Sequence, residues 1–136
     1  MVKLIMAAAG SGKTKDIINL VNEAAVNEPG SVVCIAKGNK LNFDISHKAR
    51  LINVQDYNVT DYASLLGFLA GIHAGNYDIT KIFIDSLYKV ACDDKPEDAD
   101  QFILALDEFS AKHSVEFTIA LSADASSASE VMKKYL

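Results

Sequence analysis

The sequence predicts an α/β protein, a three-layer α/β/α sandwich built around a mainly parallel sheet. Short apolar runs of strand length alternate along the chain with longer segments whose apolar residues recur every three or four positions. Strands that are connected through helices pair in parallel by right-handed crossovers, which puts helices on both faces of the sheet. The length of 136 residues suits one core, so we treat residues 1–136 as a single domain.

The first half of the chain contains three expected strands and two expected helices. Residues 2–9 form a nearly continuous apolar run, typical of a strand buried on both faces, and Gly10 ends it. Apolar residues follow helical spacing over 13–26, until the Pro-Gly pair at 29–30 stops the helix. The other expected elements are a strand at 31–36, a loop at 38–44, a strand at 50–54 and a helix at 61–74 with Thr60 or Asp61 as its N-cap.

The second half continues the alternation. Residues 81–85 read as an apolar strand that ends in an acid, and a loop then leads into an amphipathic helix at 97–112. A strand at 115–122 and a closing helix at 125–135 complete the chain. Ligands of parallel sheets bind beyond the carboxyl ends of the strands. The residues expected at that edge are Gly10, Asp56, Asp85 and Ser122.

Composition and charge exclude several classes of function. The formal net charge of −5 argues against non-specific binding to nucleic acid, which needs a basic surface. Cys34 and Cys92 lie far apart and lack the spacing of a zinc site or a disulfide framework, which fits a reduced compartment. No apolar run reaches the roughly 20 residues that a membrane span needs. We therefore expect a cytoplasmic protein without membrane attachment.

The clearest motif joins the first strand to the first helix. It reads Ala7-Ala8-Ala9-Gly10-Ser11-Gly12-Lys13-Thr14 and matches the phosphate-loop pattern, with Ala where the first Gly is usual. Small residues let consecutive backbone N–H groups turn toward phosphate oxygens, and the helix start adds its positive dipole end. Lys13 would reach the β- and γ-phosphates of ATP and the Thr14 hydroxyl would bind Mg²⁺. The expected binding residues are Ala9, Gly10, Ser11, Gly12, Lys13 and Thr14.

Asp85 supplies the second half of the expected site. It ends an apolar strand, where its carboxylate would hold the Mg²⁺ shell through water. A turn-forming or helix-capping Asp is the alternative interpretation.

With the loop from Ala7 to Thr14 and the run Ile82-Phe83-Ile84-Asp85-Ser86-Leu87, the chain resembles a minimal P-loop NTPase core of the RecA-like kind. This resemblance implies that Ser122, at the end of the next strand, senses the γ-phosphate. The chain is also similar to small stand-alone ATP-binding proteins labelled twitching-motility-type ATPases. It lacks the extra domain and the acidic and histidine boxes of the longer secretion ATPases.

Catalysis is less clearly indicated than binding. The position beside Asp85 holds Ser86 where a catalytic Glu would stand, and Asp56 is the candidate base because it follows the strand at 50–54. Arg50 is the only arginine, so a protein partner or a second subunit would have to supply an arginine finger. The predicted catalytic residues are Lys13, Asp56 and Asp85, and the predicted activity is a weak or partner-dependent ATPase or nucleotide switch.

Two other functions remain open from the sequence. A small-molecule or nucleoside kinase would hold its acceptor over the loop 38–47, near Lys37, Lys40 and Lys48. A non-hydrolysing interaction module would keep the phosphate loop for binding alone. A GTPase is disfavoured, because the run Asn39-Lys40-Leu41-Asn42 precedes Asp85 and ends in Asn instead of Asp.

Overall fold

The computed structural model describes residues 1–136 and contains one sheet of five parallel strands in the order β1-β5-β4-β2-β3. The strands are β1 (Val2–Ala7), β2 (Ser31–Ala36), β3 (Ala49–Asn53), β4 (Ile79–Ile84) and β5 (Glu116–Ser122). The helices are α1 (Lys13–Asn27), α2 (Tyr62–Gly75), α3 (Leu87–Ala91), α4 (Pro96–His113) and α5 (Glu130–Lys133), with 3₁₀ turns η1 (Val54–Tyr57) and η2 (Ala125–Ser127).

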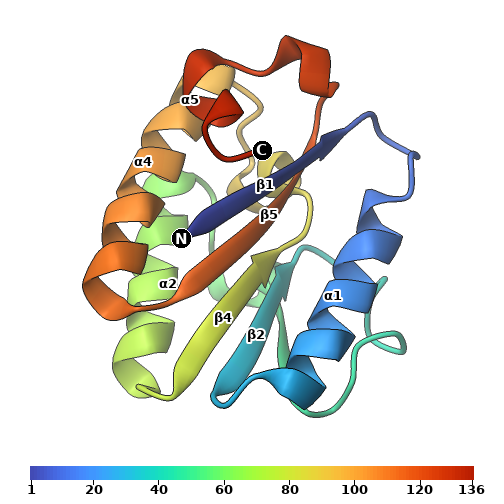
Figure 1. The fold of residues 1–136 in the computed structure, drawn as a ribbon, viewed down its shortest axis with the longest axis vertical. Helices are drawn as coiled ribbons and strands as arrows, with labels where there is room; N and C mark the ends of the chain where they lie inside the picture. Colours follow the sequence, from blue (N-terminus) through green and yellow to red (C-terminus); the bar gives the residue numbers. More distant parts are fainter.

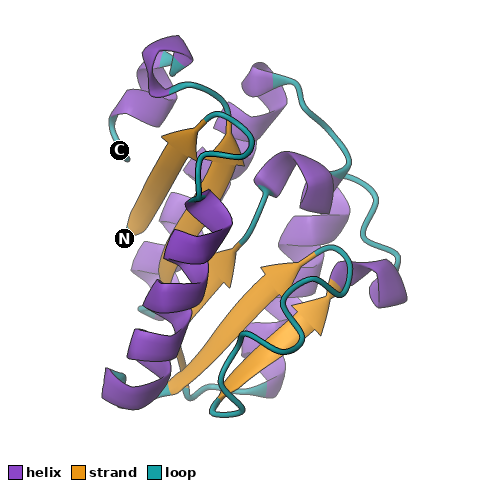
Figure 2. Cartoon of the chain, turned by 90° about the vertical axis from the view of Figure 1, so that its right-hand side faces the viewer, coloured by secondary structure: helices purple, strands orange, loops and turns teal.

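The sheet lies between two helical layers, as the alternation of apolar patterns predicts. Helix α1 packs on one face, where Ile17 and Val21 join a cluster that also takes in Leu41 and Ile45 of the loop between β2 and β3. Helices α2, α3 and α4 contribute to the larger cluster on the opposite face, with Leu69 and Leu106 among its fully buried residues. Figure 1 shows α1 on one side of the sheet and α2 and α4 on the other, and Figure 2 shows α1 in front of the strands. The α/β class and the parallel sheet are confirmed.

Two expected elements differ from the structure. The helix expected at 125–135 was wrong as a continuous element, because Asp124 accepts a hydrogen bond from the Ser126 N–H and Ser129 accepts one from the Met132 N–H. Each side chain caps a separate short turn, so η2 and α5 replace one helix. The segment after Asp85, expected to be a loop, instead forms the short helix α3.

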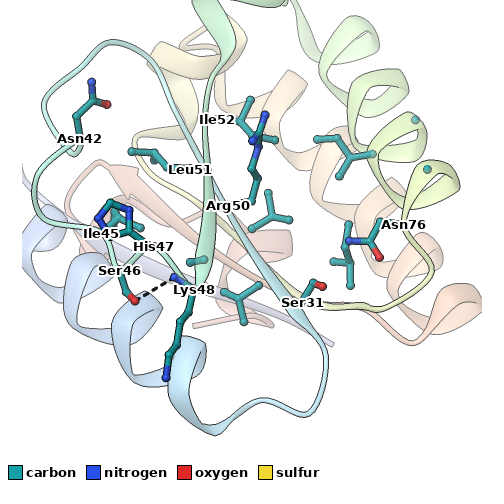
Figure 3. A pocket seen from close by; sticks show the side chains of 17 residues that line it. Ser31, Asn42, Ile45, Ser46, His47, Lys48, Arg50, Leu51, Ile52 and Asn76 are labelled. Atoms are coloured by element: carbon teal, nitrogen blue, oxygen red, sulfur yellow. Dashed lines mark hydrogen bonds between the residues drawn. The ribbon is translucent and has the colours of Figure 1, made fainter.

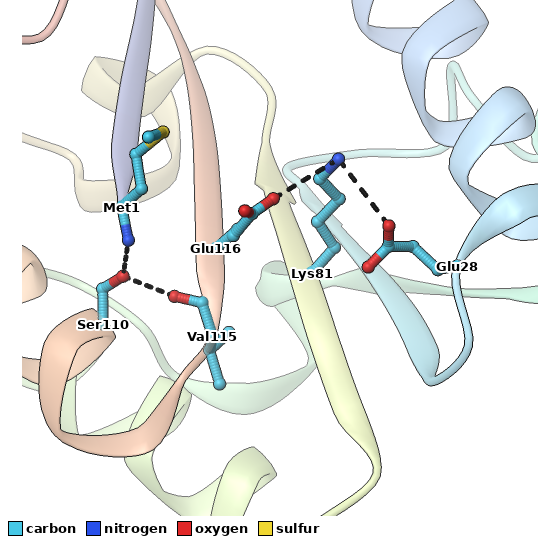
Figure 4. Close-up of polar contacts among 6 residues, drawn as sticks. All are labelled: Met1, Glu28, Lys81, Ser110, Val115 and Glu116. Carbon is cyan, nitrogen blue, oxygen red and sulfur yellow. Dashed lines mark hydrogen bonds and ion pairs between the residues drawn. The ribbon is translucent and has the colours of Figure 1, made fainter.

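Polar contacts join the elements at the amino ends of the strands (Figure 4). Lys81 of β4 lies between Glu28, at 3.9 Å, and Glu116, at 3.5 Å. The buried Ser110 hydroxyl donates to the Val115 carbonyl at 2.6 Å and accepts a hydrogen bond from the Met1 nitrogen. These contacts all lie at the amino ends of the strands, opposite the edge where the predicted site residues lie.

The two edge strands of the sheet, β1 and β3, differ in whether another segment bonds to their outer edge. On β1, the Leu4 N–H donates to the Tyr135 carbonyl at 2.7 Å, and the Tyr135 hydroxyl is anchored by a 2.9 Å bond to Asp107. The strand β3 pairs with β2 alone. No helix in the structure has the length and apolar character that a membrane crossing requires.

Candidate nucleotide site

The turn between β1 and α1 is built around two glycines with left-handed backbone angles. Gly10 has φ = 82° and Gly12 has φ = 95°, a region in which a side chain brings strain. The Ser11 N–H donates to the Ala8 carbonyl at 3.2 Å, which closes the turn. A Cβ atom at either glycine would meet no heavy atom within 4 Å, so the space beside the turn is open. The glycines are therefore required by the path of the backbone and not by crowding.

Lys13 is the first residue of α1 and is 6% exposed. Its ammonium group donates to the Ala8 carbonyl at 3.3 Å, which holds it beneath the turn. An ammonium has three N–H donors, so this one contact leaves donors for an incoming acceptor. Lys13 thus combines a nearly buried positive charge with an open loop of backbone amides.

Asp85 directly follows β4, and its N–H donates to the Ile35 carbonyl of the neighbouring β2 at 2.9 Å. The Thr14 hydroxyl lies 3.3 and 3.4 Å from the two carboxylate oxygens of Asp85, across a sequence separation of 71 residues. No lysine or arginine nitrogen lies within 4.0 Å of this carboxylate. The fold brings together the two predicted Mg²⁺ ligands.

The electrostatics of Asp85 are dominated by its burial. Burial raises its pKa above the ordinary carboxyl range, and the Thr14 hydrogen bond and the positive charges of Lys13, Lys89 and Lys40 lower it in part. A buried carboxylate without a close cation is stabilised by a divalent ion, which prefers oxygen ligands. Thr14 and Asp85 offer the oxygen ligands that would hold a Mg²⁺ ion at this place.

Three exposed lysines gather around Asp85, and the sequence identified only two of them as site candidates. Lys37, Lys40 and Lys89 line a hollow of about 80 Å³ together with Thr14 and Asp85. Lys89 was missed because α3 was not predicted. The signal was available, since the apolar residues 87, 90 and 91 follow Asp85 at helical spacing.

Ser86 lies between Asp85 and α3 in a strained conformation. Its φ of 61° is unusual for a residue with a side chain. Such strain is often found at functional sites. Here it turns the chain sharply from β4 into α3, so that Lys89 lies one helical turn beyond Asp85.

The remaining predicted binding residues lie around this edge of the sheet. Ala9 and Ser11 are exposed in the turn after β1. Ser122 is the last residue of β5, stands in register with Ala7 of β1, and lines a hollow of about 450 Å³ with Ser86. The strand β5 lies between β1 and β4, so Ser122 is positioned between the turn after β1 and Asp85, which follows β4.

Asp56 is not brought to Asp85. It lies exposed in η1, directly after β3, and β2 separates β3 from β4. It lines neither of the hollows that contain Ser86. Its role as a base stays a prediction that this geometry does not support.

Comparison with models of protein families gives no match, and comparison with curated proteins gives none either. No group of three or more His, Cys, Asp or Glu side chains is arranged to hold a metal ion. The function must therefore be inferred from the turn, Lys13 and the Thr14–Asp85 pair.

Proposed function

We propose that the chain binds the phosphates of ATP, or of another nucleoside triphosphate, over the turn from Ala8 to Gly12. Lys13 contacts the β- and γ-phosphates, and Thr14 and Asp85 hold Mg²⁺, directly and through water. The activity that follows is that of a weak or partner-dependent ATPase, or of a switch whose loops respond to the γ-phosphate. This proposal would make the chain a member of the P-loop class of nucleotide-binding proteins.

The proposal depends most on the contact between Thr14 and Asp85. A glycine turn followed by Lys and Thr at a helix start also occurs for purely structural reasons. The distant strand β4 brings the Asp85 carboxylate to 3.3 and 3.4 Å from the Thr14 hydroxyl, which is long for a hydrogen bond and leaves oxygen lone pairs on both groups for a cation. Two hard oxygen ligands beside an open loop of amides suit a Mg²⁺–phosphate complex.

Slow turnover follows from the groups around Asp85. The hollow of about 80 Å³ contains no second carboxylate that could orient or deprotonate a water molecule. Lysines from the loop after β2 and from α3 provide positive charge near the expected γ-phosphate. The site therefore favours binding and charge neutralisation over hydrolysis.

Calorimetric titration with Mg²⁺–ATP tests the proposal by comparing Lys13→Ala with Lys15→Ala. Both changes remove one positive charge from the first turn of α1, but Lys13 is nearly buried under the turn whereas Lys15 is exposed. Charge-assisted hydrogen bonds contribute about 1.5–3 kcal/mol each, so Lys13→Ala should weaken binding by about 10- to 150-fold. Lys15→Ala should change affinity only slightly.

Equal weakening in the two variants would mean that any affinity reflects general charge and not a phosphate site. Absence of ATP and GTP binding by the wild-type protein at millimolar concentration would remove the proposal altogether. Equal affinity for ATP and ADP would leave a binding site but exclude a switch, because a ligand must distinguish two states to shift them.

A small-molecule kinase is a second candidate, because Lys37 and Lys40 share the hollow of about 80 Å³ with Asp85. Their positive charges suit an anionic acceptor next to the γ-phosphate. Lys48, expected beside them, instead lines a separate hollow around β3. A screen of phosphorylated and carboxylated acceptors for ADP release above background tests this activity, and a uniformly negative screen contradicts it.

A further inference from the structure

The largest hollow of the molecule, of about 720 Å³, lies around β3 and away from Asp85. Its floor is β3 with the start of β2. One wall is the end of α2 with the following turn, and the other is the part of the loop from Asn42 to Lys48 that precedes β3 (Figure 3). Gly71 and Gly75 line the α2 wall, and a Cβ atom at either position would meet nothing within 4 Å. Because these glycines have no side chains, the α2 wall leaves room for another chain to reach the free edge of β3.

The strand β3 ends the sheet on this side. It pairs with β2 only, and no backbone hydrogen bond outside that pairing reaches residues 50–52. An edge strand presents a row of unpaired N–H and C=O groups to which another extended chain can pair. At about 3.3 Å per residue, the five residues of β3 offer an edge of roughly 17 Å. This length accommodates a segment of similar size.

The hollow has a charge opposite to that of the chain as a whole. Of its 17 lining residues, His47, Lys48 and Arg50 are basic and none is Asp or Glu, although the chain carries a net charge of −5. Lys48 and Arg50 are exposed and take part in no ion pair. Figure 3 shows both side chains beside the strand. The free cations favour a ligand that carries carboxylates.

A second copy of this chain is a poor match for the same edge. Two β3 edges paired antiparallel around a twofold axis at Leu51 would set Arg50 of each copy opposite Ile52 of the other, with the two Arg50 side chains diagonally across the pair. Neither Arg50 nor Lys48 would face a carboxylate, and the two diagonal Arg50 charges would repel one another. A different protein with a complementary acidic strand avoids this repulsion.

We propose that β3 binds an extended acidic segment of a partner protein by strand addition. The backbone of the segment pairs with the free edge of β3, and its carboxylates contact Lys48 and Arg50. Backbone pairing provides affinity in this mode, and the charges provide selectivity. This inference is independent of nucleotide binding at Lys13.

The test uses the blocked peptide acetyl-Glu-Val-Glu-Val-Glu-Val-amide and the full chain. The peptide should shift the NMR signals of residues 49–53 and slow hydrogen exchange of their outward-facing amides. A peptide with Lys in place of Glu should bind at least about tenfold more weakly at low salt, because the electrostatic contribution is reversed. A version methylated on alternate backbone nitrogens should lose binding, since it cannot pair with the strand edge.

A double charge reversal, Lys48→Glu with Arg50→Glu, should weaken binding of the acidic peptide about tenfold or more. The matched control is Lys112→Glu with Lys134→Glu, two exposed lysines elsewhere, which should leave binding unchanged. Equal binding of the acidic and basic peptides, full binding of the methylated one, or no binding at millimolar concentration would overturn the proposal. A wild-type dimer that protects the β3 amides would identify a second copy as the occupant and also overturn it.

Discussion

Replacing Asp85 by Asn should stabilise the fold while damaging the site. The carboxylate is 8% exposed, receives one hydroxyl hydrogen bond at 3.3 to 3.4 Å, and has no cation within 4.0 Å. Its loss of hydration is therefore poorly compensated in the folded state. Asn keeps an acceptor for Thr14 without the charge, so we expect a gain of about 1 kcal/mol at neutral pH, as found for relief of functional strain. For a chain of this size the melting temperature should rise by about 4 °C.

The stability that Asp85→Asn gains over the wild type should depend on pH, and its sign follows from the pKa of Asp85. Because burial raises the pKa of Asp85 in the folded protein, that state binds a proton more readily than the unfolded chain does. The wild type therefore loses stability as pH rises through this range, whereas the Asn variant does not titrate here. The advantage of the variant should be full above the folded-state pKa and disappear in acid, where Asp85 is protonated in both states.

Thermal denaturation across pH measures this difference, and Asp61→Asn provides the matched control. Asp61 is exposed, caps α2 by accepting from the Ser64 N–H at 2.7 Å, and its pKa is lowered by that bond. The same substitution should therefore reduce stability at Asp61. In parallel, Asp85→Asn should remove the difference between nucleotide affinities measured with Mg²⁺ and with EDTA. A loss of stability at Asp85 comparable with that at Asp61 would refute this reasoning and make Asp85 a structural cap.

Two further expectations concern other parts of the fold. Gly30→Ala should destabilise the fold by about 3 kcal/mol in urea unfolding, because its Cβ would clash with the Asp78 carbonyl oxygen. Gly67→Ala, whose Cβ would meet nothing within 4 Å, should stabilise α2 by about 1 kcal/mol. Equal effects of the two substitutions would contradict this packing. Loss of hydration lowers the pKa of His113, and the charges of His73 and Lys112 add to this effect. The free energy of unfolding should therefore fall as pH drops from 7 toward 5, and more steeply in the wild type than in His113→Gln. Parallel pH curves for the two proteins would rule out His113 as the cause of the fall.

The strands and long helices were predictable because their signals are local. The strand at 31–36 agrees with β2 at both ends, and Asp61, one of the two expected N-caps, caps α2. The first strand ends at Ala7, two residues earlier than expected, because the chain turns toward the positive φ of Gly10. Ala8 and Ala9 are apolar like the strand before them, so the sequence does not show that the turn begins at these residues.

The parts of the site that depend on tertiary contacts were less accessible. Thr14 and Asp85 were both predicted as Mg²⁺ ligands at the carboxyl edge of the sheet, but the strand order that sets the distance between them is not encoded in any local pattern. The same order explains why Asp56, which does follow a strand, lies away from the pair: β2 stands between. Lys89 was missed because α3 was not predicted: residues 87, 90 and 91 do keep helical spacing, but five residues show it over a single turn.

The difference between the outer edges of β1 and β3 has a consequence for assembly of the protein through its strands. Open-ended polymerisation through strands requires every subunit to offer both a donor and an acceptor edge. The Tyr135 carbonyl takes up the Leu4 N–H in the middle of β1, which interrupts the row of backbone groups that a second strand would need on that side. A chain that captures another strand at β3 therefore has an interrupted edge on its other side, which disfavours growth into a fibre.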